Sequence, residues 1–147
     1  MIYADNAATT KLSPVALQAM LPYLTEHYGN PSSLYTLGQR AAEVLEEARK
    51  TVAQCLHCRP EEIYFTSGGS EADNQAIRSA ARWGKMRGKT HIISTAFEHH
   101  AVLHTLAALE KEGFTVTLLD VGPEGRVTPQ QVAQAITDET CLVTIMY

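Results

Sequence analysis

Phe-Thr-Ser-Gly-Gly-Ser-Glu-Ala-Asp-Asn, residues 65–74, is the stretch that most clearly indicates the fold. A short apolar run typical of a strand, residues 63–66, leads into it, and a segment with helical spacing follows it. Gly68 and Gly69 let the backbone approach a ligand closely, and the first turn of a helix exposes amide N–H groups at the positive end of its dipole. The junction therefore predicts an anion-binding site, such as a phosphate cradle, or a simple helix cap.

Two observations support the simple cap. Ser70 and Asp73 resemble a capping box in which Asp takes the place of Glu. The carboxylates of Glu71 and Asp73 already complement the helix dipole and would repel an anion bound nearby. Neither G-x-x-x-x-G-K-[ST] nor G-x-G-x-x-G is present, which argues against a P-loop nucleotidase and an ordinary dinucleotide site. At this point the local residues leave both interpretations open.

Outward from this junction, short apolar runs alternate with segments of helical spacing. Strands are expected at residues 63–66, 91–95, 115–119 and 141–146, and helices at residues 14–28, 34–56, 70–83, 99–111 and 129–136. This alternation predicts an α/β fold with a mostly parallel sheet and flanking helices. Because ligands bind outside the carboxyl ends of parallel strands, we expect residues 67–70, residues 96–99 and the segment after residue 147 to gather at one edge.

Composition narrows the classes of function. The chain has 147 residues, 45% of them hydrophobic, which is enough for one core, and no linker or repeat marks an internal boundary. A formal net charge of -4 gives no electrostatic reason to bind nucleic acid or an anionic membrane surface. No apolar stretch approaches the ~20 residues that span a bilayer, and residues 1–5 lack a basic signal-like region. We expect a cytoplasmic protein whose three cysteines are thiols.

A histidine cluster follows the second predicted strand. His99 is placed at the same edge of the sheet as the glycine junction, where an imidazole could stack on a planar ring or move protons, or could simply begin an exposed helix. His100 and His104 are four residues apart and share a helix face, so zinc is conceivable. Two histidines make an incomplete site and there is no H-E-x-x-H motif, so no metal site is predicted.

A lone C-x-x-C motif, Cys55-Leu56-His57-Cys58, closes the second predicted helix. A redox pair or half of a zinc site is possible for this spacing, but no second pair and no preceding strand accompany it. A structural or incidental role is the favoured interpretation.

Taken together, four motifs resemble the cysteine desulfurases of the NifS and IscS type, within the class V aminotransferase group of pyridoxal phosphate enzymes of fold type I. They are residues 2–10 (IYADNAATT), 28–33 (YGNPSS), 65–74 (FTSGGSEADN) and 98–102 (EHHAV), in family order and with family-like spacing. The resemblance covers the whole chain but only the N-terminal portion of a family member. It implies residues 1–13 as an extended segment and residues 14–147 as part of the large cofactor-binding domain.

The resemblance also implies roles for individual residues. Gly69 and Ser70 match the pair that binds the phosphate of pyridoxal 5'-phosphate, although the family often has Thr where this chain has Ser70. His99 matches the histidine that stacks on the pyridine ring and assists proton transfer. The cofactor supplies the electron sink for the chemistry. The family takes sulfur from L-cysteine, leaves alanine and passes an enzyme persulfide to an acceptor or scaffold protein for iron-sulfur cluster assembly or other sulfur transfer.

Several functional groups of the family have no match in residues 1–147. They are the lysine that bonds to the cofactor, the persulfide cysteine, the aspartate beside the pyridine nitrogen and the arginine that holds the substrate carboxylate. No catalytic residue is therefore expected in this chain beyond His99, and the isolated chain is expected to be inactive. Two alternatives remain: a truncated, non-catalytic relative that dimerises or binds a partner, and another class V enzyme.

A partial sheet also predicts self-association. Four strands of family-like order would leave a sheet edge and a helix face uncovered, which favours pairing with a second copy. We therefore expect a homo-oligomer.

Overall fold

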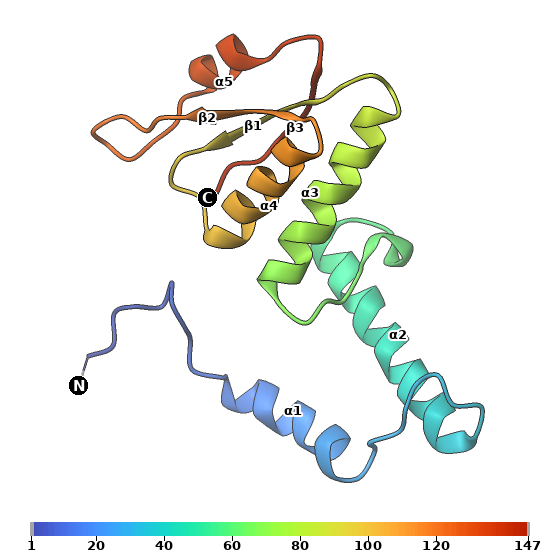
Figure 1. The fold of residues 1–147 in the computed structure, drawn as a ribbon. Helices are drawn as coiled ribbons and strands as arrows, with labels where there is room; N and C mark the ends of the chain where they lie inside the picture. Colours follow the sequence, from blue (N-terminus) through green and yellow to red (C-terminus); the bar gives the residue numbers. More distant parts are fainter. Residues whose placement is uncertain (1, 147) are drawn as a thin grey trace. The chain divides into compact units, whose positions relative to one another are not determined.

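The computed structural model describes residues 2–146, and the chain divides into two compact units, Met1–Tyr64 and Phe65–Tyr147 (Figure 1). In chain order the elements are α1 (Pro14–Thr25), α2 (Thr36–Leu56), the 3-10 helix η1 (Pro60–Glu62), α3 (Gly69–Lys85), β1 (His91–Thr95), α4 (His100–Lys111), β2 (Thr115–Leu119), α5 (Pro129–Ala135) and β3 (Thr140–Val143). None of the described helices combines the length and the apolar composition needed to span a bilayer.

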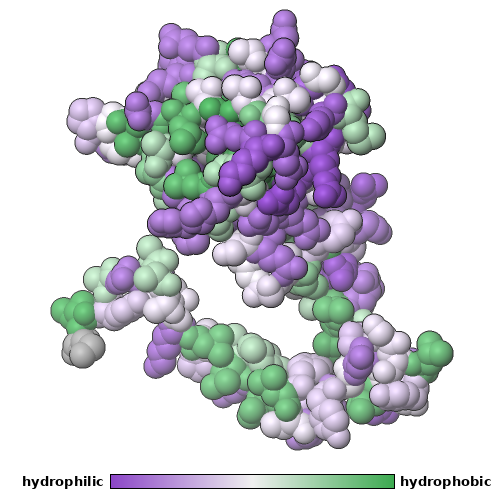
Figure 2. All heavy atoms as spheres, in the orientation of Figure 1, coloured by the Kyte–Doolittle hydropathy of each residue, from purple (hydrophilic) through white to green (hydrophobic). Residues whose placement is uncertain are grey.

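The N-terminal unit consists mainly of α1 and α2. The Ser13 hydroxyl accepts a hydrogen bond from the Ala16 amide at 3.2 Å and begins α1, which ends at Thr25 rather than at the predicted residue 28. Apolar side chains of α1 remain exposed and form part of the surface seen in Figure 2. Helix α2 ends where His57 adopts a left-handed conformation, φ 54°, between the two cysteines of the C-x-x-C motif.

The loop between α1 and α2 contains a turn at Asn30. The Ser32 amide donates to the side-chain carbonyl of Asn30 at 2.9 Å, which is an Asx turn. A Cβ atom added at Gly29 would lie 2.2 Å from the carbonyl oxygen of Leu37. Glycine at this position therefore allows the loop to pack against the first turn of α2.

The C-terminal unit is a parallel sheet with strand order β2-β1-β3. Ile92 on the central strand lies opposite Val116 on one side and Leu142 on the other, and every residue of β1 is buried. Helices α3 and α4 pack together and cover one face, while α5 lies on the other side of the sheet against β2 (Figure 1). The core consists of Ile77, Ala81, Ile92, Val102, Leu106, Leu109 and Phe114. The predicted α/β fold with a mostly parallel sheet is confirmed.

One predicted strand is absent from the sheet. Residues 63–66 have no strand assignment, and the sheet of the described chain contains three strands instead of four. Tyr64 is 71% exposed and Phe65 49% exposed, so the run before the glycine junction is not the buried strand that was expected. An apolar run becomes a strand only when a neighbouring strand completes its hydrogen-bond ladder, and sequence spacing does not supply that neighbour.

Candidate functional site

The N-terminus of α3 has no side-chain cap in the structure. Gly68 is the N-cap residue and Ser70 lies inside the helix, so the predicted capping box of Ser70 and Asp73 is wrong. The Ser70 side chain therefore does not close this terminus. An uncapped first turn leaves amide N–H groups available for another acceptor.

Glu71 instead folds back onto the loop that precedes α3. Its Oε2 atom accepts hydrogen bonds from the backbone N–H of Ser67 at 2.7 Å and from the Ser67 hydroxyl at 2.6 Å. These bonds stabilise the ionised carboxylate and lower the pKa of Glu71 below its ordinary value. The Thr66 hydroxyl adds a hydrogen bond to the carbonyl of Gly68 at 3.1 Å. Glu71 thus fixes the shape of the loop, while its charge opposes an anion at the same helix end.

Open space surrounds the two glycines. A Cβ atom at Gly68 or at Gly69 would have no neighbour within 4 Å in the described part of the chain. Packing within these residues therefore does not require glycine at either position. The space leaves the backbone amides of the first turn accessible, as a phosphate group requires. The geometry of this junction fits a phosphate.

His99 is fixed at the start of α4. It is the N-cap residue, and its Nδ1 atom accepts a hydrogen bond from the Ala101 amide at 3.1 Å. With Nδ1 as the acceptor, the proton of the neutral ring resides on Nε2. The residue is exposed, so a ring face is free for stacking and Nε2 can donate or transfer a proton. Both chemical roles predicted for His99 are compatible with this arrangement.

Asn74 joins the first turns of α3 and α4. Its Oδ1 atom accepts from the Thr105 hydroxyl at 2.6 Å, and its Nδ2 atom donates to the carbonyls of Ser70 at 2.9 Å and of Ala101 at 3.4 Å. The two helix starts are therefore held on the same side of the sheet. Because Ser70 and His99 lie at these starts, the structure brings the predicted phosphate and ring positions to one rim.

Glu98 links the loop after β1 to the segment after β3. The residue is 7% exposed, and its Oε1 atom accepts from the Thr95 hydroxyl at 3.2 Å and from the Met146 amide at 2.5 Å. Glu98 therefore ties the loop after β1 to the residues that follow β3. The segment expected after residue 147 lies outside the described residues.

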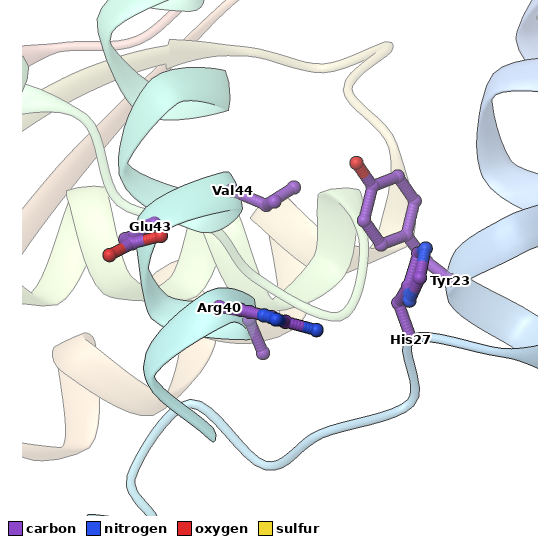
Figure 3. A pocket seen from close by; sticks show the side chains of 6 residues that line it. Tyr23, His27, Arg40, Glu43 and Val44 are labelled. Carbon is purple, nitrogen blue, oxygen red and sulfur yellow. The ribbon is translucent and has the colours of Figure 1, made fainter. Parts of the chain in front are cut away.

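A separate hollow lies in the N-terminal unit, between the end of α1 and the first half of α2 (Figure 3). Its volume is about 340 Å³, and Tyr23, His27, Arg40, Glu43 and Val44 line it together with Ala41. The rings of Tyr23 and His27 are 5.9 Å apart and tilted. None of the three predicted cofactor-binding residues takes part in this hollow.

The parallel sheet and the glycine junction are compatible with one class of protein. The family model for Aminotransferase class-V matches residues 2–147, so the chain belongs to this family. Enzymes of this family depend on pyridoxal phosphate. Over 146 residues the chain is 50% identical to "Cysteine desulfurase IscS" of Clostridium botulinum, covering 99% of this chain and 36% of that protein. A protein of the same name from Methanosarcina thermophila is 49% identical with the same coverage.

Solved structures agree with this membership. A "NifS-like protein" superposes with a TM-score of 0.88 at 37% identity, covering 96% of this chain and 38% of the other. DndA from Streptomyces lividans superposes with a TM-score of 0.84 at 37% identity, covering 98% of this chain and 40% of the other. The chain therefore spans well under half the length of the relatives that it matches.

Proposed function

We propose that the protein containing this chain is a pyridoxal phosphate-dependent cysteine desulfurase. It would take sulfur from L-cysteine, leave alanine and hold the sulfur as an enzyme persulfide for iron-sulfur cluster assembly or another sulfur transfer. The observation that carries the proposal is the 50% identity to a cysteine desulfurase over 99% of the chain. The uncapped, open N-terminus of α3 supports it from the structure.

Three residues of the C-terminal unit have proposed roles. The backbone of Gly69 and the hydroxyl of Ser70 donate hydrogen bonds to the cofactor phosphate, next to the positive end of the α3 dipole. The ring of His99 stacks on the pyridine ring, and its Nε2 atom moves a proton near the substrate. When bound, pyridoxal phosphate supplies the electron sink for cleavage of the carbon-sulfur bond.

The rest of the chemistry needs groups that residues 1–147 do not match. The chain's lysines and its three cysteines lie outside the family contexts for the cofactor lysine and the persulfide cysteine. We therefore propose that residues 1–147 in isolation are inactive and contribute the phosphate and ring-stacking side of the site. A homo-oligomer and a sulfur-accepting protein are the proposed partners.

A Ser70→Ala variant tests the proposal in the protein that contains this chain. Cofactor affinity is measured by absorbance titration of the cofactor-free protein, and sulfide and alanine are assayed with L-cysteine. Removing a hydroxyl donor to a charged phosphate should weaken cofactor binding by about tenfold. Ser79→Ala, an exposed position on the same helix, is the matched control and should change nothing. Wild-type protein without sulfide release, or unchanged cofactor affinity in Ser70→Ala, would contradict the proposal.

A further inference from the structure

His100 and His104 form a pair on α4 that the proposed cofactor site does not use. They are four residues apart on one helix, both are exposed, and their ring centroids are 5.7 Å apart with an interplanar angle of 41°. Within residues 2–146 neither ring takes part in a hydrogen bond or an ion pair. Two exposed imidazoles with no hydrogen-bond partner among the described residues thus lie next to each other.

We propose that His100 and His104 chelate a divalent transition-metal ion of the zinc, nickel or copper class. A zinc ion lies about 2.0–2.1 Å from an imidazole nitrogen, so two rings that share one ion have centroids about 5 Å apart. The observed separation of 5.7 Å is close to this value. The i, i+4 spacing on a helix holds the pair in register without any change in the backbone.

The ligand type determines the class of ion. Neutral imidazole suits zinc, copper and nickel, while magnesium and calcium prefer oxygen ligands. The described residues supply no cluster of three or more His, Cys, Asp or Glu side chains that could hold a metal, so this site has two protein ligands and water completes it. Such a site binds reversibly, because only two bonds to the protein hold the ion.

The position of the pair sets it beside the proposed active site. The ring of His100 packs edge-on against that of His99, with centroids 6.2 Å apart. An ion on the pair therefore adds positive charge next to the residue proposed to stack on the cofactor. The chelate itself rests only on α4 and does not depend on the proposed function.

Calorimetric titration of the purified protein with Ni²⁺ tests the chelate, with Mg²⁺ as the ion expected not to bind. His100→Ala and His104→Ala should each lower the Ni²⁺ affinity of this site at least tenfold, because either change removes one of the two ligands. His27→Ala, an exposed histidine of the N-terminal unit, should leave the affinity unchanged.

A double variant distinguishes the loss of a metal ligand from an incidental loss of Ni²⁺ affinity. Ala107 is exposed and lies three residues after His104, so His100→Ala combined with Ala107→His recreates a helix-spaced pair one turn further along. This double variant should regain Ni²⁺ affinity relative to His100→Ala alone. Wild-type affinity in both single variants, an equal loss in His27→Ala, or no recovery in the double variant would overturn the proposal. Circular dichroism confirms that the variants remain folded, and no readout requires activity or bound cofactor.

Discussion

Glu71 shows how a single ionised side chain can fix the shape of a loop. The side chain and the backbone N–H of Ser67 both donate to its carboxylate, and these bonds lower the pKa of Glu71. A carboxyl group whose pKa is lower in the folded state than in the unfolded state stabilises the fold when the pH is above the unfolded-state pKa. For glutamate this unfolded-state pKa is about 4.3. This stabilisation is lost as the pH falls through the lower, folded-state pKa.

We predict that Glu71→Gln lowers the melting temperature at neutral pH and that the difference from wild type narrows under acid conditions. Glutamine keeps an acceptor oxygen but loses the charge that strengthens both hydrogen bonds. Thermal unfolding followed by circular dichroism from about pH 7 to pH 3 gives the comparison, in the range where the carboxyl group titrates. Glu110→Gln, on the exposed side of α4, is the control. A Glu71→Gln difference that persists unchanged to the lowest pH would contradict the prediction.

At the same scale, local sequence allowed roles to be proposed for some residues and not for others. Gly69, Ser70 and His99 could be proposed because they stand in motifs that resemble a known family. Asn74 and Glu98 lie within those motifs, but no role could be predicted for them because their partners are distant: Thr105 is 31 residues from Asn74, and Met146 is 48 residues from Glu98. The capping box failed because the helix begins one residue before Ser70, at a boundary that spacing alone does not fix.

At the scale of elements, α3 packs against β3 through a glycine. Gly84 is buried, and a Cβ atom there would lie 2.3 Å from the Cβ atom and 2.7 Å from the Sγ atom of Cys141. Both atoms belong to a strand whose position is set by pairing with β1. The close approach of the helix to the sheet therefore depends on the absence of a side chain at this position.

We predict that Gly84→Ala destabilises the protein by about 1–3 kcal/mol, because the new methyl group overpacks the interface between α3 and β3. Chemical denaturation measures the free energy of unfolding. Gly122→Ala is the matched control: a Cβ atom there would have no neighbour within 4 Å, so its stability should stay within about 0.5 kcal/mol of wild type. Equal stability of the Gly84→Ala and Gly122→Ala proteins would show that α3 has room to move.

Sequence patterns predicted two of the three observed strands with the bounds that the structure gives them. The bounds of β1 and β2 match the predicted residues 91–95 and 115–119. The predicted strand at residues 141–146 begins one residue earlier, at Thr140, and ends at Val143, because strand assignment follows pairing with β1 rather than hydrophobicity. Residues 63–66 carry the same apolar signal but do not join the sheet. An apolar run indicates that a segment can be buried. Pairing with a neighbouring strand decides whether that segment becomes a strand.

At the scale of the whole molecule, the described chain exposes large apolar side chains and open strand edges. Val15 is 77% and Leu24 66% exposed on α1. In the described sheet, β2 and β3 each pair on one side only, with β1. Exposed apolar patches and unpaired strand edges both favour association with another protein surface.

We predict that purified residues 1–147 self-associate, with a mass by light scattering that exceeds 16.1 kDa and rises with concentration. Val15→Lys combined with Leu24→Lys should lower the associated fraction, because two charges interrupt the apolar surface of α1. Gln18→Lys, which adds a charge at an exposed polar position of the same helix, should have a smaller effect and serves as the control. If the double variant associates as strongly as wild type, the surface of α1 is not responsible and the open strand edges become the explanation. A mass of 16.1 kDa at every concentration would instead contradict self-association altogether.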